Sequence, residues 1–226
     1  MAEHGSDPDR RKKADKTEFV KHFIDLDNYT DFNNTNKIVE DFKAACSIYG
    51  KEMVIINGTL PWVTDSTYHA LVQDLKSANW EKAALTAADL GHYVGDAFMP
   101  LHITANYDGQ MSGHTGIHRR LEETMTDRYI DNVQLKTSEI RKIDQVHSYI
   151  FGYIYANHSF IGKLLTADRI AYELAGKQYN DIYYESLWKE SSLLTVQLLE
   201  ESAQTLARLI YTAWLEAGKP HIPAKL

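Results

Sequence analysis

The chain has one cysteine, no long apolar run and no excess of positive charge. Cys46 is the single cysteine among 226 residues, so an intrachain disulfide is excluded and cysteine usage indicates no compartment. No apolar run approaches the roughly 20 residues that a membrane-spanning helix needs. The net charge of −7 gives no overall basic field, which counts against a protein that binds duplex nucleic acid. An enzyme that cuts phosphodiesters is still allowed, because bound metal ions can supply local positive charge.

Strand-like alternation of apolar and polar residues is also missing, and the apolar and charged fractions of 44% and 24% are those of an ordinary globular protein. Helical periodicity, caps and breakers predict a single all-α domain over residues 1–226. Residues 1–17 are polar and charged, and we expect them to form a solvated, mobile segment without the apolar core of a signal peptide. The predicted helices cover residues 36–53, Thr64 or Asp65 to 77, 80 to Pro100, 118–133, 143–175 and 180–217.

Four of the ten histidines fall between Gly91 and Glu122. His92 and Asp96 are four residues apart, as are His118 and Glu122, and residues at this spacing lie on one face of a helix. Each pair can therefore present an imidazole nitrogen and a carboxylate oxygen to one cation, a ligand set that suits zinc.

One such pair alone is more often a solvated pair or a buried structural histidine than a metal site. Here two pairs occur in one short segment, with His102 between them. Pro100 cannot continue the first helix, so His102 leaves its axis and can turn back towards the second pair. The segment therefore predicts a metal site. His114 is a spare candidate in a glycine-flanked loop, His147 and His158 are interpreted as structural or surface residues, and His69 and His221 have no partner pattern.

The motifs HYVGD, PLH and GIHRRLE, in this order after an upstream KHFIDLD, resemble those of the zinc-dependent phospholipase C and S1/P1 nuclease superfamily. The resemblance extends loosely over most of the chain. It implies an all-α fold, zinc cofactors and hydrolysis of phosphate esters. Its members are typically exported, so the resemblance and the missing signal together leave localisation open.

The resemblance also implies a ligand set. One zinc would be held by Asp7, His22, His92 and Asp96, with Asp9 as the alternative to Asp7 because the spacing tolerates a small slip. The second would be held by His102, His118 and Glu122, and a glutamate in the last position looks more like the phospholipase branch. Asp7, as a ligand that also faces the attacking water, would be the general base.

A third zinc of the family is held by an N-terminal tryptophan and a nearby histidine. This sequence has no tryptophan before Trp62, and its one early histidine, His4, lies in a different context. We therefore expect two zinc sites, an incomplete third site and weak or absent activity, in a chain that is either a shortened or a naturally reduced form.

The expected partner is a phosphate ester, either a phospholipid head group or a single-stranded nucleic acid. Aromatic residues near the proposed ligands favour neither, because they can stack on bases or enclose a choline group. Glu122 and the net acidity tilt the prediction towards phospholipase-like chemistry. A non-catalytic scaffold that keeps metal binding, and a helical interaction module with buried histidines, are the alternatives. The aromatic candidates for a cleft are Phe19, Phe23, Tyr29, Phe98 and Tyr107.

Overall fold

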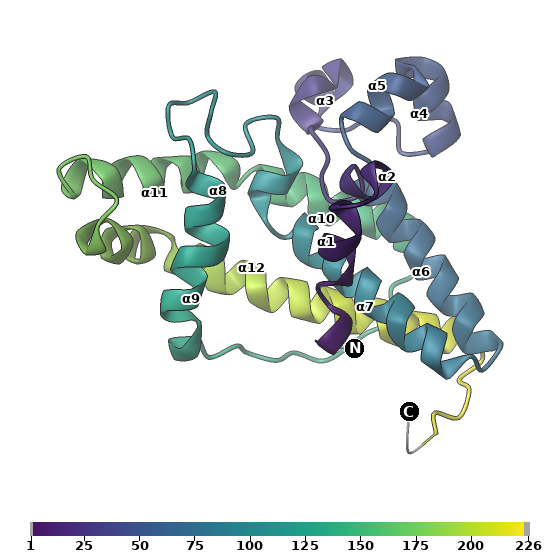
Figure 1. Cartoon of the computed structure of the whole chain (residues 1–226). Coiled ribbons are helices and arrows are strands. Elements are labelled where there is room, and N and C mark those ends of the chain that lie inside the picture. The colour runs from purple at the N-terminus through teal and green to yellow at the C-terminus, as the bar shows by residue number, and fades with distance from the viewer. Residues whose placement is uncertain (1, 224–226) are drawn as a thin grey trace.

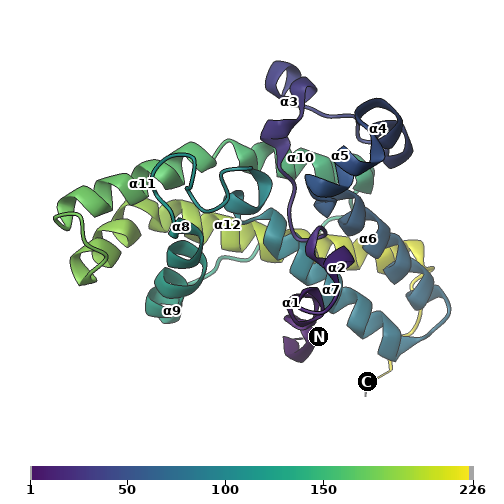
Figure 2. The same ribbon diagram turned by 45° about the horizontal axis from the view of Figure 1, so that its top comes forward.

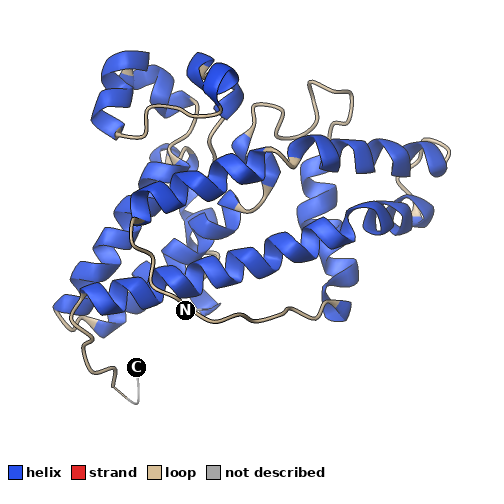
Figure 3. Cartoon of the chain, turned by 180° about the vertical axis from the view of Figure 1, so that it is seen from behind, coloured by secondary structure: helices blue, strands red, loops and turns tan. Residues whose placement is uncertain are grey.

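The computed structural model describes residues 2–223, and this part of the chain contains helices and loops but no strand (Figures 1 and 3). The prediction of an all-α protein is confirmed. Within the described range, no helix combines the length and the apolar character needed to cross a membrane. Short 3₁₀ turns cover Ala2–His4 (η1), Leu26–Asn28 (η2), Pro100–Ile103 (η3) and Ile130–Asn132 (η5).

Two long helices, α6 (Leu60–Lys76) and α7 (Trp80–Ala97), pack side by side as an antiparallel pair (Figure 1). The Asn79 side chain accepts a hydrogen bond from the Lys82 backbone N–H at 3.3 Å, which caps the start of α7. Pro100 follows its end, as the sequence predicts.

The last helix, α12 (Asp181–Glu216), is 36 residues long and runs along the whole bundle (Figure 1). Its C-terminal half contributes Leu209 to one apolar cluster with α6, α7 and α10, and its N-terminal half contributes Leu187 to a second cluster. It also approaches α7 closely, because a Cβ at Gly91 would lie 3.0 Å from the Leu206 side chain. The long helix therefore joins the two clusters.

Two predicted helices are each divided in the structure. Residues 143–175 form α10 (Val146–His158) and α11 (Ile161–Leu174), which are separated by a turn. Helix α11 packs against α12. Residues 36–53 contain α4 (Phe42–Tyr49) and α5 (Lys51–Ile56). Gly50 separates this second pair with φ of +91°, a conformation that glycine adopts at little cost.

The N-terminal segment contains three short helices, α1 (Asp7–Lys12), α2 (Lys16–Phe19) and α3 (Thr30–Thr35). Helix α1 lies against α7 (Figure 2), and the Arg11 guanidinium donates to both carboxylate oxygens of Asp89, at 3.2 and 2.8 Å. Part of the segment that we expected to be solvated and mobile is thus folded onto the bundle.

Backbone hydrogen bonds fix the segment that follows α2. The Ile24 N–H donates to the His102 carbonyl at 2.8 Å, and the Asp25 N–H donates to the Asn57 carbonyl at 2.7 Å. Gly58 makes this approach possible, since a Cβ at that position would lie 2.1 Å from the Phe23 carbonyl oxygen. Residues 22–25 are therefore held beside the chain that leaves α7.

Residues 106–116 form the glycine-containing loop around His114. It leads into a continuous helical stretch made of α8 (Ile117–Arg119), a π-helical turn (Arg120–Met125, η4) and α9 (Thr126–Tyr129). A buried network anchors this stretch. The Asp168 carboxylate, 0% exposed, accepts hydrogen bonds from Arg120 at 3.0 Å, from His114 at 2.5 Å and from the Tyr183 hydroxyl. The loop and the π turn are thus fixed to α11 and α12.

We predict that Asp168→Ala lowers the free energy of unfolding by about 3–5 kcal/mol, because it leaves the buried Arg120 charge uncompensated. The matched control is Asp181→Ala, which removes an exposed partner of Arg128 and is expected to cost less than about 1 kcal/mol. Urea denaturation followed by circular dichroism measures both. Equal effects of the two substitutions would contradict the anchoring role.

Candidate metal centre

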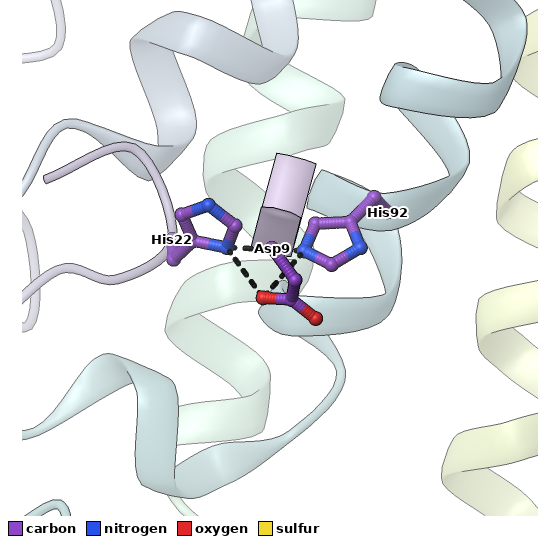
Figure 4. A group of neighbouring side chains, drawn as sticks. All are labelled: Asp9, His22 and His92. Carbon is purple, nitrogen blue, oxygen red and sulfur yellow. Dashed lines mark hydrogen bonds and ion pairs between the residues drawn. The ribbon is translucent and has the colours of Figure 1, made fainter. Parts of the chain in front are cut away.

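Three side chains from separate elements converge beside α7: Asp9 from α1, His22 from the segment after α2, and His92 from α7 itself (Figure 4). His22 Nδ1 lies 3.0 Å from His92 Nε2. Asp9 Oδ1 lies 3.7 Å from His22 Nδ1 and 3.6 Å from His92 Nε2. This first group can hold a metal ion.

Asp96 completes the first group and connects it to a second. Its Oδ2 lies 3.0 Å from His22 Nδ1 and 3.4 Å from His92 Nε2. Its Oδ1 lies 3.9 Å from His102 Nδ1, the ring nitrogen that donates to the His22 carbonyl, so Asp96 adjoins the second group from behind His102. The Asp96 side chain is only 8% exposed, so the carboxylate is a buried charge between the histidines.

The second group consists of His102 from η3, His118 from α8 and Glu122 from the π turn. Glu122 directs one carboxylate oxygen to each histidine, at 3.6 Å from His102 Nε2 and 2.9 Å from His118 Nε2. The two imidazole rings meet edge to face, with centroids 4.7 Å apart. π-Helical turns often occur at functional sites, and here the turn carries the carboxylate of the group.

Hydrogen bonds to backbone carbonyls fix which nitrogen of each histidine faces the centre. The Nδ1–H groups of His92, His102 and His118 donate to the carbonyls of Gly5 at 2.9 Å, His22 at 2.8 Å and Tyr107 at 3.1 Å. A carbonyl only accepts, so in each neutral ring the Nε2 lone pair points at the centre. The same arrangement orients histidine ligands in metal proteins.

Without a cation, this arrangement brings hydrogen-bond acceptors together. Carboxylate oxygens and imidazole lone pairs face one another in both groups. Lys12 pairs with Asp9 Oδ1 at 2.5 Å, and the remaining acceptors need a proton or a metal ion. Asp96 Oδ2 and His102 Nε2 are buried without a hydrogen-bond partner in the described part of the chain. Buried polar atoms are rarely left in this state. The donor set therefore fits a metal ion in each group.

The pKa shifts in the second group also show that its carboxylates favour a neighbouring positive charge. Burial opposes the charged form of His102, but Asp96 and Glu122 outweigh it and raise the pKa of His102 to about 9. Burial also opposes the charge of Glu122, but His102 and His118 outweigh it and hold its pKa well below the usual range. For Asp9, burial is outweighed by Lys12 and His92, so its pKa is lowered and the carboxylate is ionised at neutral pH.

Six of the seven ligands implied by the resemblance lie together in this centre, and Asp7 does not. The Asp7 carboxylate accepts hydrogen bonds from His4 at 2.8 Å and from Arg10 at 3.1 Å. Asp9, the alternative in the sequence analysis, takes its place. Residues two apart on a helix point in different directions, so only one of the two aspartates can face His22 and His92. The spacing from His22 does not distinguish them.

No family model matches this chain, and no curated protein matches it. The site therefore rests on its own geometry and on the motif resemblance.

Two cavities adjoin the centre. One, of about 510 Å³, is lined by three of the histidines together with Phe19, Phe23, Asp25 and Tyr107. The other, of about 320 Å³, adjoins Asp96 and Glu122 and has mostly apolar walls from α7, η4 and α12, among them Phe98 and Leu198. Four of the five aromatic residues proposed for a cleft line one of these cavities. The fifth, Tyr29, is fully buried in the core.

We predict that Asp9→Asn lowers the zinc content of the purified chain from about two ions per molecule towards one, because it removes the carboxylate of the first group. Asp7→Asn is the matched control and should leave the zinc content unchanged, since its partners are His4 and Arg10. Elemental analysis after dialysis measures both. Loss of zinc in the Asp7 variant alone would reassign the ligand.

Two aspartates beside the centre, Asp25 and Asp27, have opposite pKa shifts. Burial, with help from Asp27, raises the pKa of Asp25 to about 6 from its ordinary value of 3.8. Burial also opposes the charge of Asp27, but hydrogen bonds from His158 and Thr104 outweigh it and lower the pKa of Asp27. Between pH 3.8 and about 6 the folded state keeps a proton on Asp25 that the unfolded state loses, so this group destabilises the fold as pH rises.

In metal-free protein we therefore expect Asp25→Asn to raise the free energy of unfolding by about 1–3 kcal/mol at pH 7.5, with the gain vanishing near pH 4. Asp27→Asn should lower stability at pH 7.5. Urea denaturation in a chelator across this pH range tests both, and effects of the same sign for the two variants would refute the assignment.

Proposed function

We propose that this chain is a zinc-dependent phosphodiester hydrolase of the phospholipase C type. The observation that carries the proposal is the pair of histidine–carboxylate groups that meet at the buried Asp96. Two neighbouring divalent ions are a recurrent arrangement in enzymes that hydrolyse phosphate esters. Imidazole and carboxylate ligands without thiolate suit zinc, whereas magnesium prefers oxygen ligands.

Zinc ions bound here would act as Lewis acids, lower the pKa of a bound water and supply positive charge to attract an anionic ester. The chain's own residues have separate roles. His22, His92, His102 and His118 would hold the ions, and the backbone carbonyls behind three of them keep the rings in place. Asp9 is ionised and 45% exposed, so it could accept a proton from water, a role that the resemblance implied for Asp7.

Lys12 brings a positive charge to the edge of the larger cavity. Its Nζ lies 2.5 Å from Asp9 Oδ1, and its side chain lines the cavity with His22 and His118. A phosphate group that entered from this side would therefore meet a lysine as well as the centre. We expect low turnover, because the resemblance implies three zinc ions and the described residues form two such groups.

The apolar cavity favours a lipid-like substrate over a nucleic acid. Its walls present leucine, methionine and phenylalanine side chains next to Asp96 and Glu122, which suits an apolar group attached to the phosphate. The net charge of −7 also disfavours a long polyanion. One observation supports a single-strand nuclease instead: Phe19 and Phe23 pack edge to face in the larger cavity near Tyr107, and aromatic rings can stack on bases.

The deciding experiment measures zinc content and hydrolysis together. The zinc-loaded chain should hold about two ions and release phosphocholine slowly from phosphatidylcholine, faster than it cleaves single-stranded DNA. His92→Ala should lose zinc and activity. His69→Ala, which changes an exposed histidine outside both groups, should keep both.

The other outcomes separate the alternatives. Preferred cleavage of DNA would favour the nuclease, and two bound zinc ions without any hydrolysis would favour a non-catalytic metal-binding scaffold. Absence of zinc with an unchanged melting temperature in chelator would refute the metal centre and favour a helical interaction module.

A further inference from the structure

His22 differs from the other three histidines of the centre in how its outer nitrogen is satisfied. His22 faces Asp9, Asp96 and His92 with Nδ1, so this atom is its ligand atom and the proton of the neutral ring lies on Nε2. The other three rings donate their outer N–H to backbone carbonyls. His22 Nε2 is buried and has no hydrogen-bond partner in the described part of the chain.

The carboxylate of Glu18 lies next to this nitrogen. Glu18 Oε1 is 4.0 Å from His22 Nε2, about 1 Å beyond hydrogen-bond length, and both side chains are almost fully buried, at 3% and 4% exposure. A small shift of either side chain would bring the two atoms into contact. A buried ionised carboxylate beside an N–H donor is a strong electrostatic pair, because little water screens it.

Glu18 is itself held in place by three groups. The Tyr93 hydroxyl donates to Oε1 at 2.6 Å, Lys21 lies 2.6 Å from Oε2, and Arg11 lies 3.4 Å from Oε1. Arg11 belongs to α1, which carries Asp9, and Tyr93 belongs to α7, which carries His92 and Asp96. Glu18 therefore touches, or lies beside, every element that supplies a ligand of the first group.

We propose that Glu18 is a positioning residue of the first metal group, acting through His22. It accepts a hydrogen bond from the Nε2–H of His22 and so fixes the tautomer in which the Nδ1 lone pair points at the metal. It also makes Nδ1 a more basic ligand for the metal. Carboxylates that accept from a ligating histidine act in this way in other metal sites. The inference rests on the metal centre of the proposed function, but not on the reaction or its substrate.

The test measures zinc affinity of the first group alone. In a His118→Ala background, which disables the second group, Glu18→Gln should weaken zinc binding by about 10- to 100-fold. In a chain that carries His22→Ala as well, the same substitution should change the affinity by less than about twofold, because its effect passes through that ring. Competition with a chromophoric chelator gives the affinities, and the visible spectrum of bound cobalt(II) reports the ligand geometry.

Two further variants separate positioning from folding. Asp74→Asn removes another buried carboxylate, one that holds Lys82 and Thr86 at 2.8 Å each, and should lower stability without changing zinc affinity. Glu18→Asp keeps the charge but withdraws it from His22, and should give an intermediate loss even if the glutamine variant does not fold.

The possible failures are distinguishable. An unchanged affinity in Glu18→Gln, or the same loss with and without His22, would overturn the role of Glu18 while leaving the centre intact. A wild-type chain that binds no zinc would overturn both proposals. Loss of affinity in a chain that binds zinc but hydrolyses no phosphodiester would support Glu18 and refute only the proposed reaction.

Discussion

The buried carboxylate of Asp96 is the constraint on which the rest of the centre depends. It lies on α7 between His22, His92 and His102, with Oδ2 beside the two histidines of the first group and Oδ1 beside His102 of the second. A buried charge is costly unless opposite charge or hydrogen bonds compensate it. The segments that carry the other ligands are accordingly tied to α7 and to one another. The Ile24 N–H donates to the His102 carbonyl, the His102 ring donates to the His22 carbonyl, and Arg11 pairs with Asp89.

Much of the fold could be predicted from local pattern, and the exceptions have local causes. Helices α7 and α12 follow the prediction closely, because Asn79, Pro100 and Asn180 mark their ends with side-chain caps or a ring that stops the helix. The breaks at Gly50 and near Ser159 were missed, since apolar periodicity continues across both. The short helix α1 was also missed, because six residues carry too little pattern and its stability comes from contact with α7.

The candidate site was predictable where ligands share a helix and ambiguous where they do not. The HxxxD and HxxxE spacings place His92 with Asp96 and His118 with Glu122 directly. The choice between Asp7 and Asp9 depends on which side of α1 meets α7, a tertiary fact that no spacing contains. Glu18 belongs to no motif. Its role follows only from the burial of its carboxylate and from His22 Nε2, which has no hydrogen-bond partner in the described part of the chain.

The same geometry links metal binding to the folding of the N-terminal segment. Helix α1 has six residues and cannot be stable by itself, so its position depends on Arg11, Asp9 and the carbonyl of Gly5, which all contact residues of the centre or of α7. A ligand that binds only the folded arrangement stabilises it by a free energy that grows with the affinity and the concentration of the ligand. An ion between Asp9, His22 and His92 would therefore hold α1 against α7, and each contact that holds α1 there raises the affinity for the ion.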